Sequence, residues 1–159
     1  MTVKKEEQQK VWEEIHEKLQ TAMKQEILAM REILANMHQE ELSLVSQDST
    51  FLGVLRHERN ELLTRLSNLR SIRLSFIDEL SYFYYNKDNQ KISIEGQLSD
   101  VTRSETLILC DQIIALAGKI HDQNQQNHFL AIQQRRKPYP MPAIDPKRRK
   151  IYLQTEEEG

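Results

Sequence analysis

Every proline of this 159-residue chain lies within its last 22 residues, at Pro138, Pro140, Pro142 and Pro146. Proline inside a helix removes a backbone donor and costs roughly 3 kcal/mol, so a long stretch without proline favours helices. The chain also has only four glycines, too few for the glycine-rich turns of a nucleotide-binding α/β domain. The position of the prolines therefore predicts a helical domain over residues 1–134 and a tail over residues 135–159.

Apolar side chains recur at steps of three or four residues along this helical domain, which is the spacing of one helical face. The first stripe consists of Trp12, Ile15, Leu19, Met23, Ile27, Met30, Leu34 and Met37. The second stripe consists of Leu52, Leu55, Arg59, Leu62, Leu66, Leu69, Arg73, Phe76, Leu80 and Phe83. The third begins with Leu109, Ile113, Leu116 and Ile120 and continues through Gln123, Asn127 and Leu130. These stripes predict helices over about residues 8–46, 49–85 and 100–134.

Three helices of this length predict an all-α fold, an elongated antiparallel bundle of coiled-coil type. The first stripe stops at Ser46–Thr50, where several good N-cap residues favour a break or a tight reversal. A bent continuous helix is the alternative. Arg59 and Arg73 interrupt the second stripe, so we expect them near an end or edge where a guanidinium reaches water or a carboxylate. A bundle this slender buries little surface, and its stripes need a partner to be fully covered, which leaves monomer and homodimer both open.

The tail differs from the helical domain in charge as well as in proline content. Residues 1–134 carry 15 basic against 20 acidic side chains, whereas residues 135–159 carry 7 against 4. A basic, proline-rich segment favours polyproline II over a packed core, so we expect a disordered tail. Its basic clusters can attract nucleic acid, although the glutamates at 156–158 follow at once, so nucleic acid is not the expected partner. Docking through a tail tyrosine, Tyr139 or Tyr152, is the alternative.

The sequence carries no catalytic or metal-binding motif. Glu13 and His16 form a single E-x-x-H pair, whereas a carboxylate-bridged di-iron bundle needs a second pair and two further glutamates. We therefore expect both side chains at the surface. A catalytic thiol needs a nearby base, and Cys110 comes with no such signature. We predict a protein that is not an enzyme and has no cofactor and no metal.

The sequence also bears on where in the cell the protein is expected. There is no apolar run of 18 or more residues, so no membrane span is expected. A single cysteine cannot form an internal disulfide, which favours a reducing compartment such as the cytoplasm.

Two stretches of the sequence resemble a known family. The first is Glu58–Leu69, with Glu-Arg followed by a paired leucine, and it is preceded by Glu40–Leu44 and Asp48. The second is Asn124–Leu130, which contains an N-x-x-N element. Together they resemble the FlgN-like flagellar export chaperones, which have an acidic residue before the hairpin, this leucine-rich segment after it and N-x-x-N-G on the last helix. His128 stands where that family has glycine.

The resemblance implies a non-enzymatic export chaperone. Such a protein binds the C-terminal helical segments of the hook–filament junction proteins FlgK and FlgL and delivers them to the flagellar type III export gate. A client helix would lie in a groove beside the last helix, where apolar residues supply burial and amides fix the register. The expected client-binding residues are Ile113, Leu116, Ile120, Asn124, Asn127, Leu130 and Ile132. The resemblance also implies docking on the export gate by a tail tyrosine, for which Tyr139 is the first candidate and Tyr152 the second.

Two other classes of protein fit the same sequence. One is a structural coiled-coil stalk or scaffold of a secretion apparatus, whose stripes close by self-association and which would tolerate Asn127→Leu. The other is a regulatory or nucleic-acid-associated protein that acts through its tail. Client binding that is lost when residues 113–132 are changed would favour the chaperone. Salt-dependent DNA binding that is lost without residues 135–150 would favour the third class.

Overall fold

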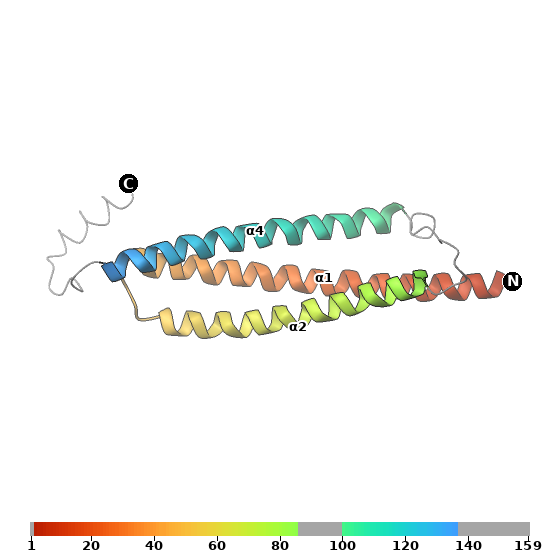
Figure 1. The fold of residues 1–159 in the computed structure, drawn as a ribbon, viewed down its shortest axis with the longest axis horizontal. Coiled ribbons are helices and arrows are strands. Elements are labelled where there is room, and N and C mark those ends of the chain that lie inside the picture. The colour runs from red at the N-terminus through yellow and green to blue at the C-terminus, as the bar shows by residue number, and fades with distance from the viewer. Residues whose placement is uncertain (1, 86–99, 137–159) are drawn as a thin grey trace.

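A computed structural model of the chain describes residues 2–85 and 100–136. Its helices are α1 (Thr2–Val45), α2 (Leu52–Tyr85) and α4 (Asp100–Arg136). In Figure 1, α2 runs antiparallel to α1 and α4 runs parallel to α1, which makes an elongated up–down–up bundle. The predicted all-α fold of three long helices is confirmed. The tail, predicted to be disordered, lies outside the described residues from residue 137 onward.

The helix α1 begins at Thr2, earlier than the expected residue 8. Residues 4–10 are all Lys, Glu or Gln, which are strong helix formers, and no breaker precedes the apolar stripe. Most side chains of this first part of α1 are exposed. It extends beyond the ends of the other two helices in Figure 1 and so lengthens α1 without adding to the core.

A tight reversal joins α1 to α2. Gln47 has a left-handed backbone with φ of 56°. Its N–H donates to the carbonyl of Leu44 at 3.3 Å, and the N–H of Asp48 donates to the carbonyl of Ser43 at 3.0 Å. These two bonds make a Schellman motif, which ends a helix by satisfying its last carbonyls. The carboxylate of Asp48 then accepts the N–H of Thr50 at 3.0 Å, so α2 begins slightly later than predicted.

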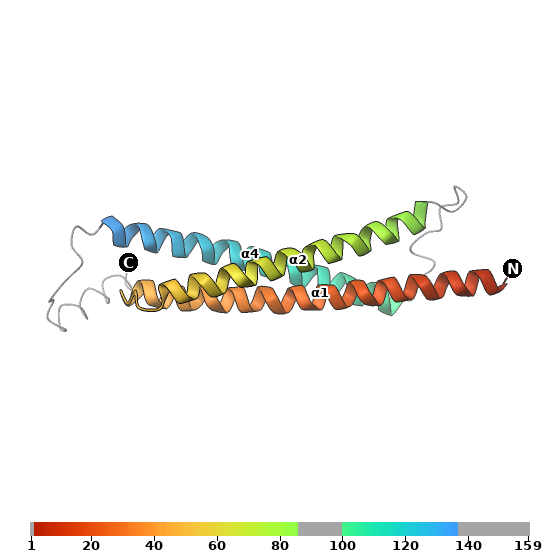
Figure 2. The same cartoon turned by 90° about the horizontal axis from the view of Figure 1, so that it is seen from below.

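The middle helix of the bundle is α1. It packs against both α2 and α4, whereas α2 and α4 make few contacts with each other over the described residues. Figure 2 shows α2 and α4 inclined in opposite directions along α1. The buried apolar side chains of α1 are Trp12, Leu19, Ala22, Met23, Ile27, Ala29, Met30, Ile33, Met37 and Leu44. On α2 and α4 the apolar stripes are mostly half-buried, because each of these helices has α1 as its main neighbour.

One apolar cluster brings all three helices together. Its buried members are Leu19, Met23 and Ile27 of α1 and Leu109 of α4. The side chains packed against it are Phe76 and Leu80 of α2 and Cys110, Ile113 and Leu116 of α4. Cys110, which follows Leu109 of the third stripe, is therefore part of the packing between helices.

Candidate functional site

A buried polar cluster joins the three helices in the half of the bundle nearer the α1–α2 reversal. Glu40 of α1 is only 6% exposed, and its carboxylate lies 3.0 Å from Nη1 of Arg59 on α2. The same carboxylate accepts a hydrogen bond of 3.1 Å from Nδ2 of Asn127 on α4. Nδ2 of Asn127 also donates to the carbonyl of Met37 at 2.8 Å. Because the cluster takes side chains from three helices, it fixes both α2 and α4 against α1.

Two further amides complete the cluster. Asn36 of α1 accepts a hydrogen bond from Nε of Arg59 at 3.0 Å and donates to a backbone carbonyl of α2 at 2.9 Å. Gln123 of α4 donates to the side chain of Asn127 at 2.9 Å and to the carboxylate of Glu41 at 2.7 Å. The polar half of the third stripe thus has the partners that buried amides require, and these partners lie on α1.

A second buried carboxylate lies two heptads before Glu40 on α1. Glu26 is 1% exposed, and its Oε2 lies 2.6 Å from Nε of Arg73. Arg73 in turn lies two heptads after Arg59 on α2, so a single antiparallel register produces both ion pairs. The two arginines do reach carboxylates, as expected. Arg73 lies well inside α2 and not at its end, but its side chain is 22% exposed, so it takes the edge position of the two that were expected.

The structure divides the predicted client-binding residues among three environments. Ile113 and Leu116 pack against the apolar cluster, and Asn127 is buried in the polar cluster. Asn124 is exposed. The remaining three are half-buried: Ile120, Leu130 and Ile132. The α4 stripe therefore contacts α1 and still leaves part of several apolar side chains accessible.

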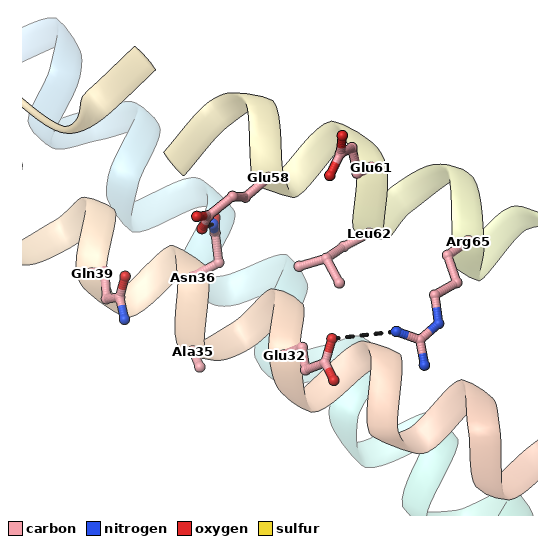
Figure 3. A pocket seen from close by; sticks show the side chains of 8 residues that line it. All are labelled: Glu32, Ala35, Asn36, Gln39, Glu58, Glu61, Leu62 and Arg65. Atoms are coloured by element: carbon pink, nitrogen blue, oxygen red, sulfur yellow. Dashed lines mark hydrogen bonds and ion pairs between the residues drawn. The ribbon is translucent and has the colours of Figure 1, made fainter. Parts of the chain in front are cut away.

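Two adjoining cavities lie along the seam between α1 and α2, and we name them together the hairpin groove. The first, of about 480 Å³, is lined by polar residues that include Asn36, Glu32, Glu58, Glu61 and Arg65. Figure 3 shows Leu62 between the helices and Arg65 reaching across to Glu32, at 3.6 Å. The second cavity, of about 360 Å³, lies nearer the reversal and shares Gln39 and Glu58 with the first. Its apolar lining consists of Leu42, Phe51, Val54 and Leu55.

The two residues of the E-x-x-H pair differ in burial. Glu13 is exposed as expected, but His16 is only 6% exposed and its ring lies 5.5 Å from that of Trp12. Burial lowers the pKa of His16 below its ordinary value of 6.5. The expectation of a surface position is therefore wrong for His16, which lies one helical turn from the buried Trp12 and beside its ring.

Over the part of the chain that the structure describes, no group of His, Cys, Asp and Glu side chains is placed to hold a metal ion. Within the same ranges, none of the helices combines the length and apolarity needed to cross a membrane. Tyr139 and Tyr152, predicted to dock on the export gate, lie outside the described residues.

Comparison of the chain with known protein families, with curated proteins and with solved structures finds no significant match.

Proposed function

We propose that this chain is a non-enzymatic export chaperone that holds an amphipathic helix of a client protein against α2 and α4. The observation that supports the proposal most directly is the unequal burial of the three stripes. The core-facing side chains of α1 are covered from two sides, whereas those of α2 and α4 are mostly half-buried. Apolar surface of this kind is what a further amphipathic helix covers in helix-in-groove recognition.

The available burial is suited to reversible binding. Full burial of a large aliphatic side chain contributes about 1.5–3 kcal/mol, so covering the exposed half of each contributes about 1 kcal/mol. The accessible candidates on α4 are Ile120, Leu130 and Ile132, and Leu66 is half-buried on α2. Several such side chains, together with those of the client, offset the cost of association and give an affinity of about micromolar order. A carrier that must later release its client needs binding of this strength.

The identity of the client rests on the sequence resemblance. FlgN-like chaperones carry the hook–filament junction proteins FlgK and FlgL to the flagellar type III export gate, and we propose the same clients, destination and cytoplasmic location for this chain. Asn127 bonds to α1, so the client-binding role proposed for it would require those bonds to be exchanged. The half-buried apolar side chains of α4 are therefore the first to test.

The test compares two isoleucines of α4 that differ in exposure. Ile120 is half-buried on the proposed surface, whereas Ile114 is 69% exposed and serves as the matched control. Binding of a peptide from the C-terminal helix of FlgK or FlgL is measured by calorimetry. We expect Ile120→Lys to weaken binding by about tenfold or more, which corresponds to about 1.4 kcal/mol, and Ile114→Lys to leave it nearly unchanged.

Circular dichroism establishes that each variant remains helical. Client binding that is unaffected by Ile120→Lys would contradict the proposed surface. If the full-length chain binds neither peptide and forms only a stable self-assembled coiled coil, the chaperone proposal fails. The structural stalk is then favoured, in agreement with the register-setting ion pairs that are common in coiled coils.

A further inference from the structure

The end of the hairpin groove nearest the reversal is an exposed apolar surface. Leu42 is 70% exposed, Phe51 59% and Val54 55%. All three line one cavity together with the buried Leu55. Isolated exposed apolar side chains are ordinary, but a cluster of large ones around a hollow marks an interaction site.

The neighbouring cavity of the hairpin groove is acidic. Glu32, Glu58 and Glu61 line it, and Arg65 is the single basic side chain among its lining residues. Arg65 faces Glu32 across the cavity, and Glu58 lies beside Asn36 (Figure 3). Glu58 also lines the apolar cavity, so the negative charge begins where the apolar surface ends. The matching occupant is a segment with several positive charges next to a few large apolar side chains.

We propose that the hairpin groove binds this chain's own C-terminal segment Lys147–Leu153. Its sequence is Lys-Arg-Arg-Lys-Ile-Tyr-Leu, four basic residues followed directly by three large apolar ones. The basic residues lie at the acidic cavity, and the three that follow cover Leu42, Phe51 and Val54. The contact does not depend on the proposed function of the chain.

The chain leaves the bundle at the right place for this contact. Helix α4 ends at Arg136, at the same end of the bundle as the α1–α2 reversal (Figure 1). The linker from Arg136 to Lys147 spans up to roughly 36 Å when extended. The groove from Leu42 to Glu32 covers roughly 15 Å of helix, and neighbouring helices lie about 10 Å apart. The linker is therefore long enough to place the basic residues at the far end of the groove.

Tethering favours the chain's own segment over one from a second copy. A flexible linker of this length gives an effective concentration of millimolar order. With an effective concentration of about 1 mM and a segment dissociation constant of about 0.25 mM, the segment is bound about four times as often as it is free. Its backbone amides would then exchange about fivefold more slowly than in an unbound chain. Protection of this origin does not change with protein concentration, and it weakens at high salt because the exposed charges are screened.

The experiment is hydrogen exchange by mass spectrometry on the full-length chain at low salt, with the peptide that covers Lys147–Leu153 as the readout. We expect about fivefold protection, lost in Val54→Lys and in the double variant Glu58→Lys, Glu61→Lys. Leu63→Lys is the control, since Leu63 is 44% exposed on α2 and does not line the groove. It should leave protection intact.

A charge exchange completes the test. Changing all four basic residues of the segment to glutamate should abolish protection in the wild-type groove. It should restore part of that protection in the Glu58→Lys, Glu61→Lys variant. Exchange at the intrinsic rate in the wild-type chain would overturn the proposal. So would protection that rises with protein concentration, which would assign the segment to a second copy, or protection that the groove variants leave unchanged.

Discussion

The buried ion pair between Glu26 and Arg73 allows a sharp test of how α1 and α2 hold their register. Arg73→Leu leaves a carboxylate that is 1% exposed without its cationic partner. Removing one partner of a buried ion pair costs about 3–5 kcal/mol, because the remaining charge is buried and uncompensated. Glu26→Leu leaves a guanidinium whose side chain is 22% exposed and can extend toward water. We expect this variant to lose about half as much stability.

Changing both residues removes both charges, so no charge is left without its partner. The antiparallel register places Ile33 opposite Leu66 on one side of the pair, and Leu19 and Leu80 pack in the apolar cluster on the other. Two leucines in place of Glu26 and Arg73 therefore extend an apolar layer. Replacing a buried ion pair by apolar side chains of similar size is often neutral, or stabilising by about 1–4 kcal/mol. We expect the double variant to be at least as stable as the wild-type chain.

Urea unfolding followed by circular dichroism measures the free energy of unfolding of the four proteins, and the double-mutant cycle isolates the interaction. The exposed pair of Glu32 and Arg65 is the control, because its side chains are 53% and 48% exposed and its cycle should give less than about 1 kcal/mol. Equal losses of stability in the two single variants would contradict the expected effect of burial on the remaining charge. So would a double variant that loses the sum of the single losses.

Three further outcomes are expected. Asn127→Leu removes a donor to Glu40 and should lower the free energy of unfolding by about 1–3 kcal/mol, whereas Asn124→Leu at an exposed position should change it little. Gln47→Gly removes the steric strain that a side chain causes in the left-handed conformation and should raise the melting temperature. Gln47→Ala keeps a side chain at this position and is the neutral control. Burial lowers the pKa of His16, so the unfolded chain binds its proton first as the pH falls. The contribution of neutral, buried His16 to the free energy of unfolding is complete above about pH 6.5 and is lost as the pH falls through the folded-state pKa. On acidification the urea midpoint of the wild-type chain should therefore fall more steeply than that of His16→Gln.

The sequence allows the helices and the reversal to be predicted because these depend on local patterns. The apolar stripe of α1 marks a buried face, and Trp12 and Leu19 are indeed buried. The run of capping residues before α2 marks the reversal, although the left-handed Gln47 is not recognisable, because that position is usually glycine. Helix boundaries follow from the same local signals and differ from the prediction mainly at the start of α1.

The buried carboxylates of α1 were not predicted, and the reason is the width of its buried face. A helix that packs on two sides buries a second stripe, and in α1 this stripe contains Glu26, Asn36 and Glu40. Polar residues at helical spacing are normally assigned to the solvent-facing side. A signal was nevertheless present in the sequence, since Glu26 and Glu40 have the same two-heptad spacing as Arg59 and Arg73. Matching the two spacings would have predicted both the pairs and the register.

The two sides of α1 specify their partner helices by different means. The side facing α2 carries two buried carboxylates. Glu26 pairs with Arg73, and Glu40 pairs with Arg59 and, at 3.8 Å, with Arg56. A shift of one heptad would separate these pairs. On the side facing α4, Met23 packs with Leu109 in the apolar cluster, and Asn127 is the buried polar anchor. The same apolar cluster also packs Phe76 and Leu80 of α2, so apolar contacts are common to both sides. The difference lies in the polar contacts: ion pairs set the register of α2, whereas neutral amide donors set that of α4, the helix on which the client is proposed to bind.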